Sequence, residues 1–253
     1  MSAIGTPIEA LAVLIAGVAA GAINTIVGSG SLVTFPTLLA LGYPPVVANV
    51  SNTVGLVAGS ASGVVGYRRE LSGQGARIRT LGVAALLGGA SGACLLLLLP
   101  ASTFARVVPF LIATASVLMA LQPRLSKLIA VRRPQGVHGS AGFIAIFLTA
   151  IYGGYFGAAQ SVLFMAFLAI LVPEDLQRLN ALKNVLALLV NLVAALIFIA
   201  VADVAWQAAA LIAVGSIVGG QVGALIGRRL PARALRLAVV AIGLVVAAKM
   251  LAS

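Results

Sequence analysis

The chain has 253 residues, of which 62% are hydrophobic and 8% are charged, and its mean hydropathy is +1.17. A soluble domain of this length needs more polar surface, so the composition excludes a soluble protein and indicates an integral membrane protein. The net charge of +11 comes from basic residues in short loops between apolar runs, where such charges set membrane topology. No RNA-binding motif or basic-aromatic stripe accompanies them, so nucleic acid is not an expected partner.

Ten apolar runs follow one another along the chain. Their length, and the absence of the ten-residue alternation of a barrel strand, predict an all-α, polytopic bundle of transmembrane helices. Two runs are shorter than the roughly 20 residues that a crossing helix needs, and each follows a glycine-rich break, so both are predicted to be half-helices of broken or re-entrant elements. The runs fall at about 7–27, 31–42, 44–66, 80–99, 104–121, 139–158, 160–172, 176–200, 205–227 and 234–251, the short ones being the second and the seventh.

The two halves of the chain match each other at a nearly constant offset of 132 positions. The clearest matches pair Gly21 with Gly153, Ser29 with Ser161, Phe35 with Phe167 and Asn52 with Asn184. We therefore expect a single membrane domain over residues 1–253, built from two homologous halves. It would consist of a first repeat at about 7–121, a basic cytoplasmic linker at 122–138 and a second repeat at about 139–251.

Equivalent loops of the two repeats carry opposite charge. Four arginines follow the run at 44–66, whereas the equivalent loop at 201–206 carries no base. Conversely, four arginines flank Pro231, and only one lies near its counterpart Pro100. By the positive-inside rule these loops lie on opposite faces of the membrane, so we predict an inverted repeat with both chain ends on the non-cytoplasmic side. Each half would open with a hairpin that enters and leaves on one side, at 7–42 and at 139–172.

Several short motifs accompany the duplication. The first half carries Gly28-Ser29-Gly30, Pro36, Leu39-Ala40-Leu41-Gly42 and Ala48-Asn49-Val50-Ser51-Asn52, and the second half begins Tyr152-Gly153-Gly154-Tyr155-Phe156-Gly157. This series resembles the sulfite exporter TauE/SafE family over nearly the whole chain. The resemblance implies a membrane transporter of sulfite, sulfonates or related organosulfur anions.

The two breaks are the first candidates for a substrate site. A broken helix leaves backbone N–H groups that must be satisfied, and the N-terminus of the following half-helix carries partial positive charge that suits an oxyanion. Matching broken helices in two repeats are typical of a transporter's binding site. The alternative is a close helix crossing, where small residues let two backbones approach. The substrate-binding residues predicted at the breaks are Gly28, Ser29, Gly30, Ser31, Gly157, Gln160 and Ser161.

Four further polar residues in apolar runs complete the predicted site: Asn24, Asn52, Asn184 and Lys183. An amide in a membrane helix either lines a site or bonds to a neighbouring helix. A lysine inside the membrane is costly and often functional, and an anion is its natural partner. Its alternatives are snorkelling to the interface, or pairing with the acidic Glu174-Asp175 that precedes its run.

The chain has no Walker A motif, no G-x-S-x-G motif and no spacing of metal ligands, and Cys94 is its single cysteine. No enzyme, no catalytic residue, no cofactor and no metal are therefore expected. The expected partners are a small anion and the lipid bilayer of the cell membrane, and a homodimer is left open. We predict a secondary transporter that exports a small sulfur-containing anion, such as sulfite or sulfoacetate, by alternating access. The alternatives are an anion channel and a sensory or structural membrane subunit without flux.

Overall fold

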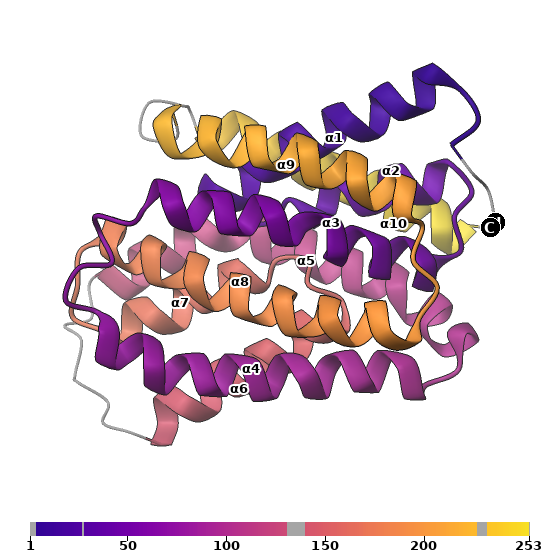
Figure 1. The fold of residues 1–253 in the computed structure, drawn as a ribbon. Helices are drawn as coiled ribbons and strands as arrows, with labels where there is room; N and C mark the ends of the chain where they lie inside the picture. Colours follow the sequence, from indigo (N-terminus) through magenta and orange to yellow (C-terminus); the bar gives the residue numbers. More distant parts are fainter. Residues whose placement is uncertain (1–3, 27, 131–139, 227–231, 253) are drawn as a thin grey trace.

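Ten helices and no strand make up the part of the chain that the computed structural model describes, which covers residues 4–26, 28–130, 140–226 and 232–252 (Figure 1). The predicted all-α, polytopic bundle is confirmed, and each apolar run corresponds to one helix. The helices are α1 (Pro7–Ile26), α2 (Ser31–Ala40), α3 (Pro45–Gly66), α4 (Gly75–Leu98), α5 (Ala101–Ala130), α6 (Ser140–Tyr155), α7 (Gln160–Leu171), α8 (Leu176–Val201), α9 (Trp206–Ile226) and α10 (Ala232–Ala252).

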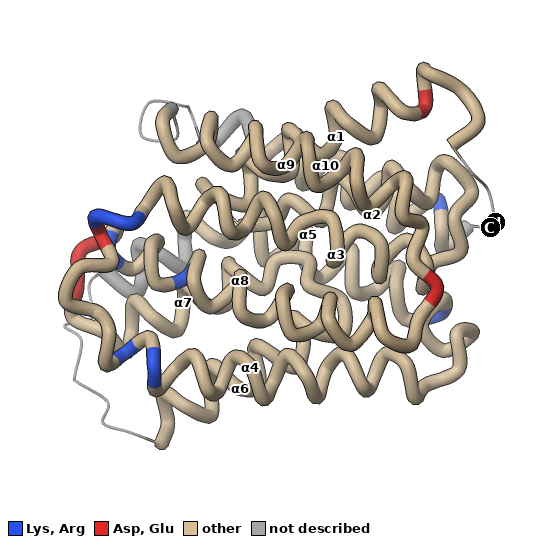
Figure 2. Tube along the Cα trace, in the orientation of Figure 1, with Lys and Arg blue, Asp and Glu red and all other residues tan. Residues whose placement is uncertain are grey.

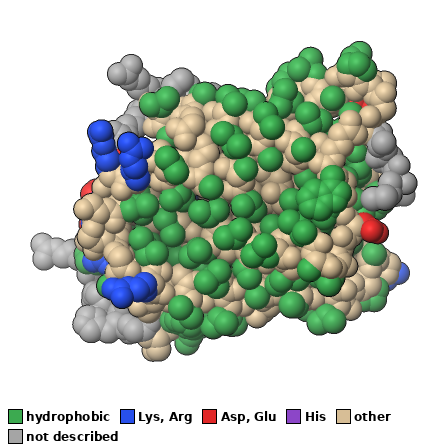
Figure 3. Space-filling model, in the orientation of Figure 1, with side chains coloured by type: hydrophobic (Ala, Val, Ile, Leu, Met, Phe, Trp, Pro, Cys, Tyr) green, Lys and Arg blue, Asp and Glu red, His purple; other side chains and the backbone are tan. Residues whose placement is uncertain are grey.

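Apolar side chains cover the broad face of the bundle, and charged residues gather toward its two ends (Figures 2 and 3). Leu98 and Leu225, for example, are 82% and 76% exposed. Among the described helices, α1, α4, α5, α8 and α9 are long and apolar enough to cross a membrane. Because so much exposed apolar surface would be unfavourable in water, lipid is the solvent of this surface, as expected for a multi-pass membrane protein.

The two halves of the chain interlock. Helix α1 packs on α9, and its counterpart in the second half, α6, packs on α4. Helix α3 also packs on α9, and its counterpart α8 packs on α4. Glycines allow the closest crossings: a Cβ at Gly219 would overlap the carbonyl of Val18, and a Cβ at Gly92 would overlap the carbonyl of Ile151. Each half therefore buries its first helix against the other half.

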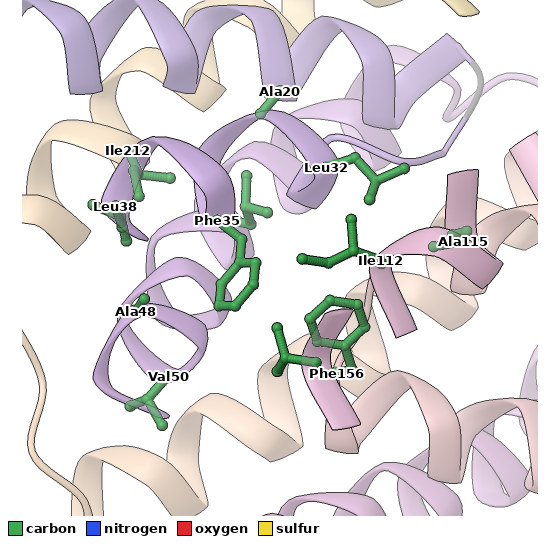
Figure 4. Close-up of a cluster of buried hydrophobic side chains, with 14 of the residues drawn as sticks. Ala20, Leu32, Phe35, Leu38, Ala48, Val50, Ile112, Ala115, Phe156 and Ile212 are labelled. Carbon is green, nitrogen blue, oxygen red and sulfur yellow. The ribbon is translucent and has the colours of Figure 1, made fainter. Parts of the chain in front are cut away.

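The centre of the bundle is formed where α3 and α8 pack against each other. Beside them lies a cluster of buried apolar side chains contributed by both halves (Figure 4). Phe35 of α2 meets Phe156, which directly follows α6, edge to face with 5.4 Å between ring centroids. This aromatic contact joins the two segments that carry the breaks.

The short helices return toward the end from which their hairpins start. In Figure 1 the hairpin of α1 and α2 begins and ends at the right-hand end of the bundle, and that of α6 and α7 begins and ends at the left. With 10 and 12 residues, α2 and α7 measure only about 15 and 18 Å, too short to cross a bilayer core of about 30 Å. The α3–α4 turn lies at the left-hand end and the α8–α9 turn at the right.

Helix α5 is longer than the sequence predicted. It runs to Ala130, so residues 122–130, the first part of the predicted linker, are helical. Basic residues are good helix formers and are favoured near a helix C-terminus, so the charges of this segment do not end the helix. The rest of the predicted linker, 131–138, lies outside the described residues.

A polar cluster ties α4 to the α7–α8 turn. The carboxylate of Glu174 accepts hydrogen bonds from Arg77 at 2.5 Å and from Arg178 at 2.6 Å. Arg178 also donates to the backbone carbonyl of Ser72 at 3.0 Å, which fixes the α3–α4 turn. The bonds from Arg77 and then Arg178 lower the pKa of Glu174 below its ordinary value.

Glu174→Gln is expected to lower the free energy of unfolding by about 1 kcal/mol at neutral pH, because it removes the charge from two partly exposed ion pairs. The folded-state pKa of Glu174 lies below the unfolded value, so its stabilisation is complete above pH about 5 and is lost as the pH falls through the folded pKa. Denaturation in detergent across this range should show the variant and wild type converging in acid. Replacing the exposed Arg79 by Gln is the control, and a gap that persisted to pH about 2 would contradict the ion pairs.

Candidate functional site

The first break lies between α1 and α2. Gly28 has a φ of +95° and its N–H donates to the carbonyl of Ile23 at 2.8 Å, which closes the end of α1. The side-chain oxygen of Asn24 accepts a hydrogen bond from the N–H of Gly30 at 2.9 Å, just before α2 begins. Gly30 is packed so tightly that a Cβ there would overlap the backbone of Ala20. Asn24 thus holds the break together.

The second break lies between α6 and α7 and uses a different turn. Gly157 has a φ of +79°, and Ala159, directly before α7, has a φ of +61°. The hydroxyl of Tyr152 donates to the carbonyl of Ala158 at 2.6 Å and so spans the turn. Ala159 is a non-glycine residue in the left-handed region, which carries a conformational cost of about 1–2 kcal/mol.

Ala159→Gly is expected to leave the free energy of unfolding within about 0.5 kcal/mol of wild type, since relief of the left-handed conformation offsets the lost methyl and the greater chain entropy. Ala158 is the matched control: it is equally buried, but its φ is not positive. Ala158→Gly should lower the free energy of unfolding by about 1.5 kcal/mol. Equal losses in the two variants, measured by denaturation in detergent, would contradict the strained turn.

The two breaks touch each other. A Cβ at Gly28 would overlap the Cβ of Ser161, so the backbone of the first break lies directly against the start of α7. A few residues away, Phe35 and Phe156 form their edge-to-face contact. Half-helices α2 and α7 therefore both begin at one place in the bundle and run apart from it.

A small polar cavity lies at this meeting point. Both breaks contribute to its wall, and α3 and α8 complete it. The lining includes six of the predicted site residues, namely Asn24, Ser31, Gly157, Gln160, Ser161 and Asn184. It also includes five residues outside the predicted set, namely Thr25, Ser60, Gly63, Ala187 and Asn191, of which Asn191 is a further amide in an apolar run.

One wall of the cavity is a chain of hydrogen-bonded side chains. Gln160 donates from Nε2 to the Oδ1 of Asn191 at 2.9 Å, and Asn191 donates from Nδ2 to the hydroxyl of Ser60 at 3.3 Å. The Oε1 of Gln160 lies where a Cβ of Gly153 would be, so that glycine leaves room for the amide. Asn184 is 6% exposed, and its Nδ2 has no hydrogen-bond partner among the described residues.

The remaining predicted site residues lie around the cavity rather than on its wall. Gly28 and Gly30 shape the first break, and Ser29 is 1% exposed with a hydroxyl that has no hydrogen-bond partner in the described part of the chain. Asn52 is buried in α3, where the hydroxyl of Thr34 donates to its Oδ1. Ser29 and Asn52 are thus placed behind the wall.

Lys183 is buried within α8 and is 1% exposed. Its Nζ donates to the backbone carbonyl of Asn24 at 3.3 Å, near the C-terminal end of α1, where the helix dipole favours a cation. The acidic residues considered as its alternative partners are engaged elsewhere: Glu174 binds two arginines, and Asp175 caps the first turn of α8. The Lys183 amine therefore lies beside the cavity, hydrogen-bonded to Asn24, which lines it.

The chemistry of the cavity suits a small anion. Its side chains are amides and hydroxyls, two half-helices begin at it, and the buried amine of Lys183 lies at its edge. No carboxylate lines it, and the described residues contain no group of three or more His, Cys, Asp or Glu side chains that could hold a metal. Backbone and side-chain donors together with a cation favour negative charge.

A family model described as "Sulfite exporter TauE/SafE" matches residues 13–250. The chain belongs to this family. It is 27% identical over 236 residues to the probable membrane transporter protein YfcA of Escherichia coli K12, covering 92% of this chain and 86% of that protein. It is 26% identical over 218 residues to a probable membrane transporter protein of Haemophilus influenzae, covering 86% and 85%. It is 24% identical over 238 residues to the probable membrane transporter protein ORF9 of a Sinorhizobium species, covering 94% and 90%.

No solved structure matches the chain. TauE/SafE membership and the names of these relatives make the protein a multi-pass transporter of the cell membrane and not an enzyme. The resemblance drawn from the glycine breaks is therefore confirmed at the level of the family.

Three of the lining residues outside the predicted set of this TauE/SafE protein have a signal in the sequence. Asn191 follows Asn184 by seven residues, or two helical turns, and therefore shares its face of α8. Ser60 and Gly63 belong to a stretch of small residues in α3, which indicates a face that lies close to another segment. Thr25 and Ala187 carried no such signal, because single threonines and alanines are common in membrane helices.

Proposed function

We propose that this TauE/SafE protein exports a small sulfur-containing oxyanion, such as sulfite or a sulfonate like sulfoacetate, and binds it in the cavity between the two breaks. This proposal rests mainly on the Nδ2 of Asn184, which has no hydrogen-bond partner among the described residues. This donor lies at a buried cavity whose described lining contains no carboxylate. An acceptor-rich anion would satisfy that donor, and Lys183 would supply compensating charge from the edge.

Alternating access would arise from movement of one half against the other. An inverted repeat is supported by the α3–α4 and α8–α9 turns, which lie at opposite ends of the bundle, and by hairpins that start from opposite ends (Figure 1). The end that carries the α3–α4 turn, with Arg68 and Arg69, would face the cytoplasm under the positive-inside rule. The cavity, which both breaks line, would then be reached from either side in turn.

The driving force in this proposal is the membrane potential. Each negative charge that leaves an inside-negative cell gains about 2.3 kcal/mol per 100 mV. The five acids of the chain, Glu9, Glu70, Glu174, Asp175 and Asp203, all lie at or near helix ends or in turns, so the membrane interior offers no carboxylate for a proton relay. Export down the potential needs no coupled ion.

Counterflow in proteoliposomes tests the proposal. Vesicles loaded with unlabelled sulfite should accumulate labelled sulfite transiently, and sulfoacetate inside should support the same exchange. An imposed potential should speed net export, whereas a pH gradient alone should not. Flux that followed only the pH gradient would contradict potential-driven export. Flux without counterflow would indicate a channel, and no flux or binding of any tested anion would indicate a subunit without transport.

A further inference from the structure

Two adjacent polar positions on α3 have counterparts on α8. Ser51 and Asn52 match Lys183 and Asn184 at the offset of 132 residues. All four side chains are buried, with exposed fractions of 6% or less. In a symmetric site the two pairs would have equivalent surroundings, so a difference between their surroundings makes the site asymmetric.

Each residue of the α3 pair accepts a hydrogen bond from another segment of the chain. The hydroxyl of Ser51 accepts a hydrogen bond from the N–H of Ala205 at 2.8 Å, directly before α9. The Oδ1 of Asn52 accepts a hydrogen bond from the hydroxyl of Thr34 on α2. Neither residue lines the cavity. The polar groups of this pair therefore join helices of the bundle.

The α8 pair faces the breaks instead. Asn184 lines the cavity, and its Nδ2 has no hydrogen-bond partner among the described residues. The residue 132 positions after Thr34 is Ala166, which has no hydroxyl that could engage Asn184. Within the described part of the chain, Lys183 donates a hydrogen bond only to the backbone carbonyl of Asn24 at the first break. A buried amide N–H without a partner is unfavourable, and a ligand that brings an acceptor oxygen removes this penalty.

We propose that Asn184 is the specificity-determining donor of the substrate site, and that its counterpart Asn52 serves packing alone. The pseudo-symmetric bundle would then hold one asymmetric site. This inference rests on the proposed function and narrows its substrate class. The donor of Asn184, with Lys183 close by, selects oxyanions such as sulfite and sulfoacetate. A zwitterion such as taurine is disfavoured, because no carboxylate lines the cavity to pair with its ammonium group.

The test is a ligand titration on the purified full-length protein in detergent at constant ionic strength. Sulfite, sulfoacetate and taurine are added to wild type and variants, and the midpoint of thermal unfolding is followed for each concentration. Asn184→Leu should weaken binding of sulfite and sulfoacetate about tenfold or more, with an unliganded midpoint equal to or above that of wild type. Taurine should shift the wild-type midpoint little.

Thr34→Val is the matched control, because it removes the hydrogen bond to Asn52 without touching the cavity wall. It should lower the unliganded midpoint and leave sulfite affinity within about twofold of wild type. Asn52→Leu should behave in the same way. Equal loss of affinity in the Asn52 and Asn184 variants would overturn the asymmetric site. A wild-type protein that bound none of the three compounds would instead overturn the proposed function itself, and this inference with it.

Discussion

Lys183→Met is expected to weaken sulfite binding by about 10- to 100-fold and to raise the free energy of unfolding by about 1 kcal/mol. The side chain is 1% exposed, and its ammonium donates to a backbone carbonyl rather than to a carboxylate. A lysine inside a membrane helix costs about 2.5–3.5 kcal/mol, which exceeds the contribution of one hydrogen bond from a charged donor. The substitution should therefore stabilise the fold while it removes the positive charge that the proposed anion would meet.

Two measurements check this result, namely sulfite titration and denaturation in detergent, each on wild type and variant. Lys249→Met is the matched control, because Lys249 is exposed in the last turn of α10 and should change neither quantity. Lys183→Arg should retain part of the affinity through its charge. A methionine variant that bound sulfite like wild type and unfolded more easily would identify Lys183 as a cap for α1 only.

The breaks and part of the cavity wall could be predicted from the sequence. Asn24, Gln160 and Asn184 are amides beside interruptions in apolar runs, and the repeat placed the two interruptions in register. The direction of each polar atom could not be predicted in this way. Asn52 matches Asn184 in sequence, yet a hydroxyl of another helix engages it behind the wall. That outcome depends on how α2 crosses α3, which periodicity within one segment does not encode.

The helices themselves were predictable because a membrane leaves few alternatives to them. Which helices pack against each other was less predictable. Small residues on α4 and α9 allow a close approach to any suitable helix face, so the sequence did not indicate that α1 would pack on α9 and α6 on α4. Through this exchange, the first helix of each hairpin packs on the half to which it does not belong, whereas α2 and α7 contact helices of both halves. The two breaks therefore lie where the halves meet, and a movement of one half against the other would change the cavity between them.

The contact between the breaks gives the largest expected loss of stability. Gly28→Ala should lower the free energy of unfolding by about 3 kcal/mol, because alanine is strained at a φ of +95° and its Cβ would overlap Ser161. Gly42→Ala separates the cost of the positive φ from the cost of the overlap with Ser161. Gly42 has a φ of +83°, but nothing lies within 4 Å of a Cβ built there, so this variant should lose only the conformational part, about 1–2 kcal/mol.

A double-mutant cycle measures the part of the loss that comes from the overlap with Ser161. Ser161→Gly removes the Cβ that alanine at position 28 would strike, so the pair of substitutions should recover about 1–2 kcal/mol relative to the sum of the single losses. The same substitution should not rescue Gly42→Ala, which lies away from the breaks. Additive losses in both pairs, with Gly28→Ala no worse than Gly42→Ala, would mean that the breaks are apart in the resting protein. A positive coupling confined to Gly28 and Ser161 would place the two half-helix starts in contact beside one polar cavity.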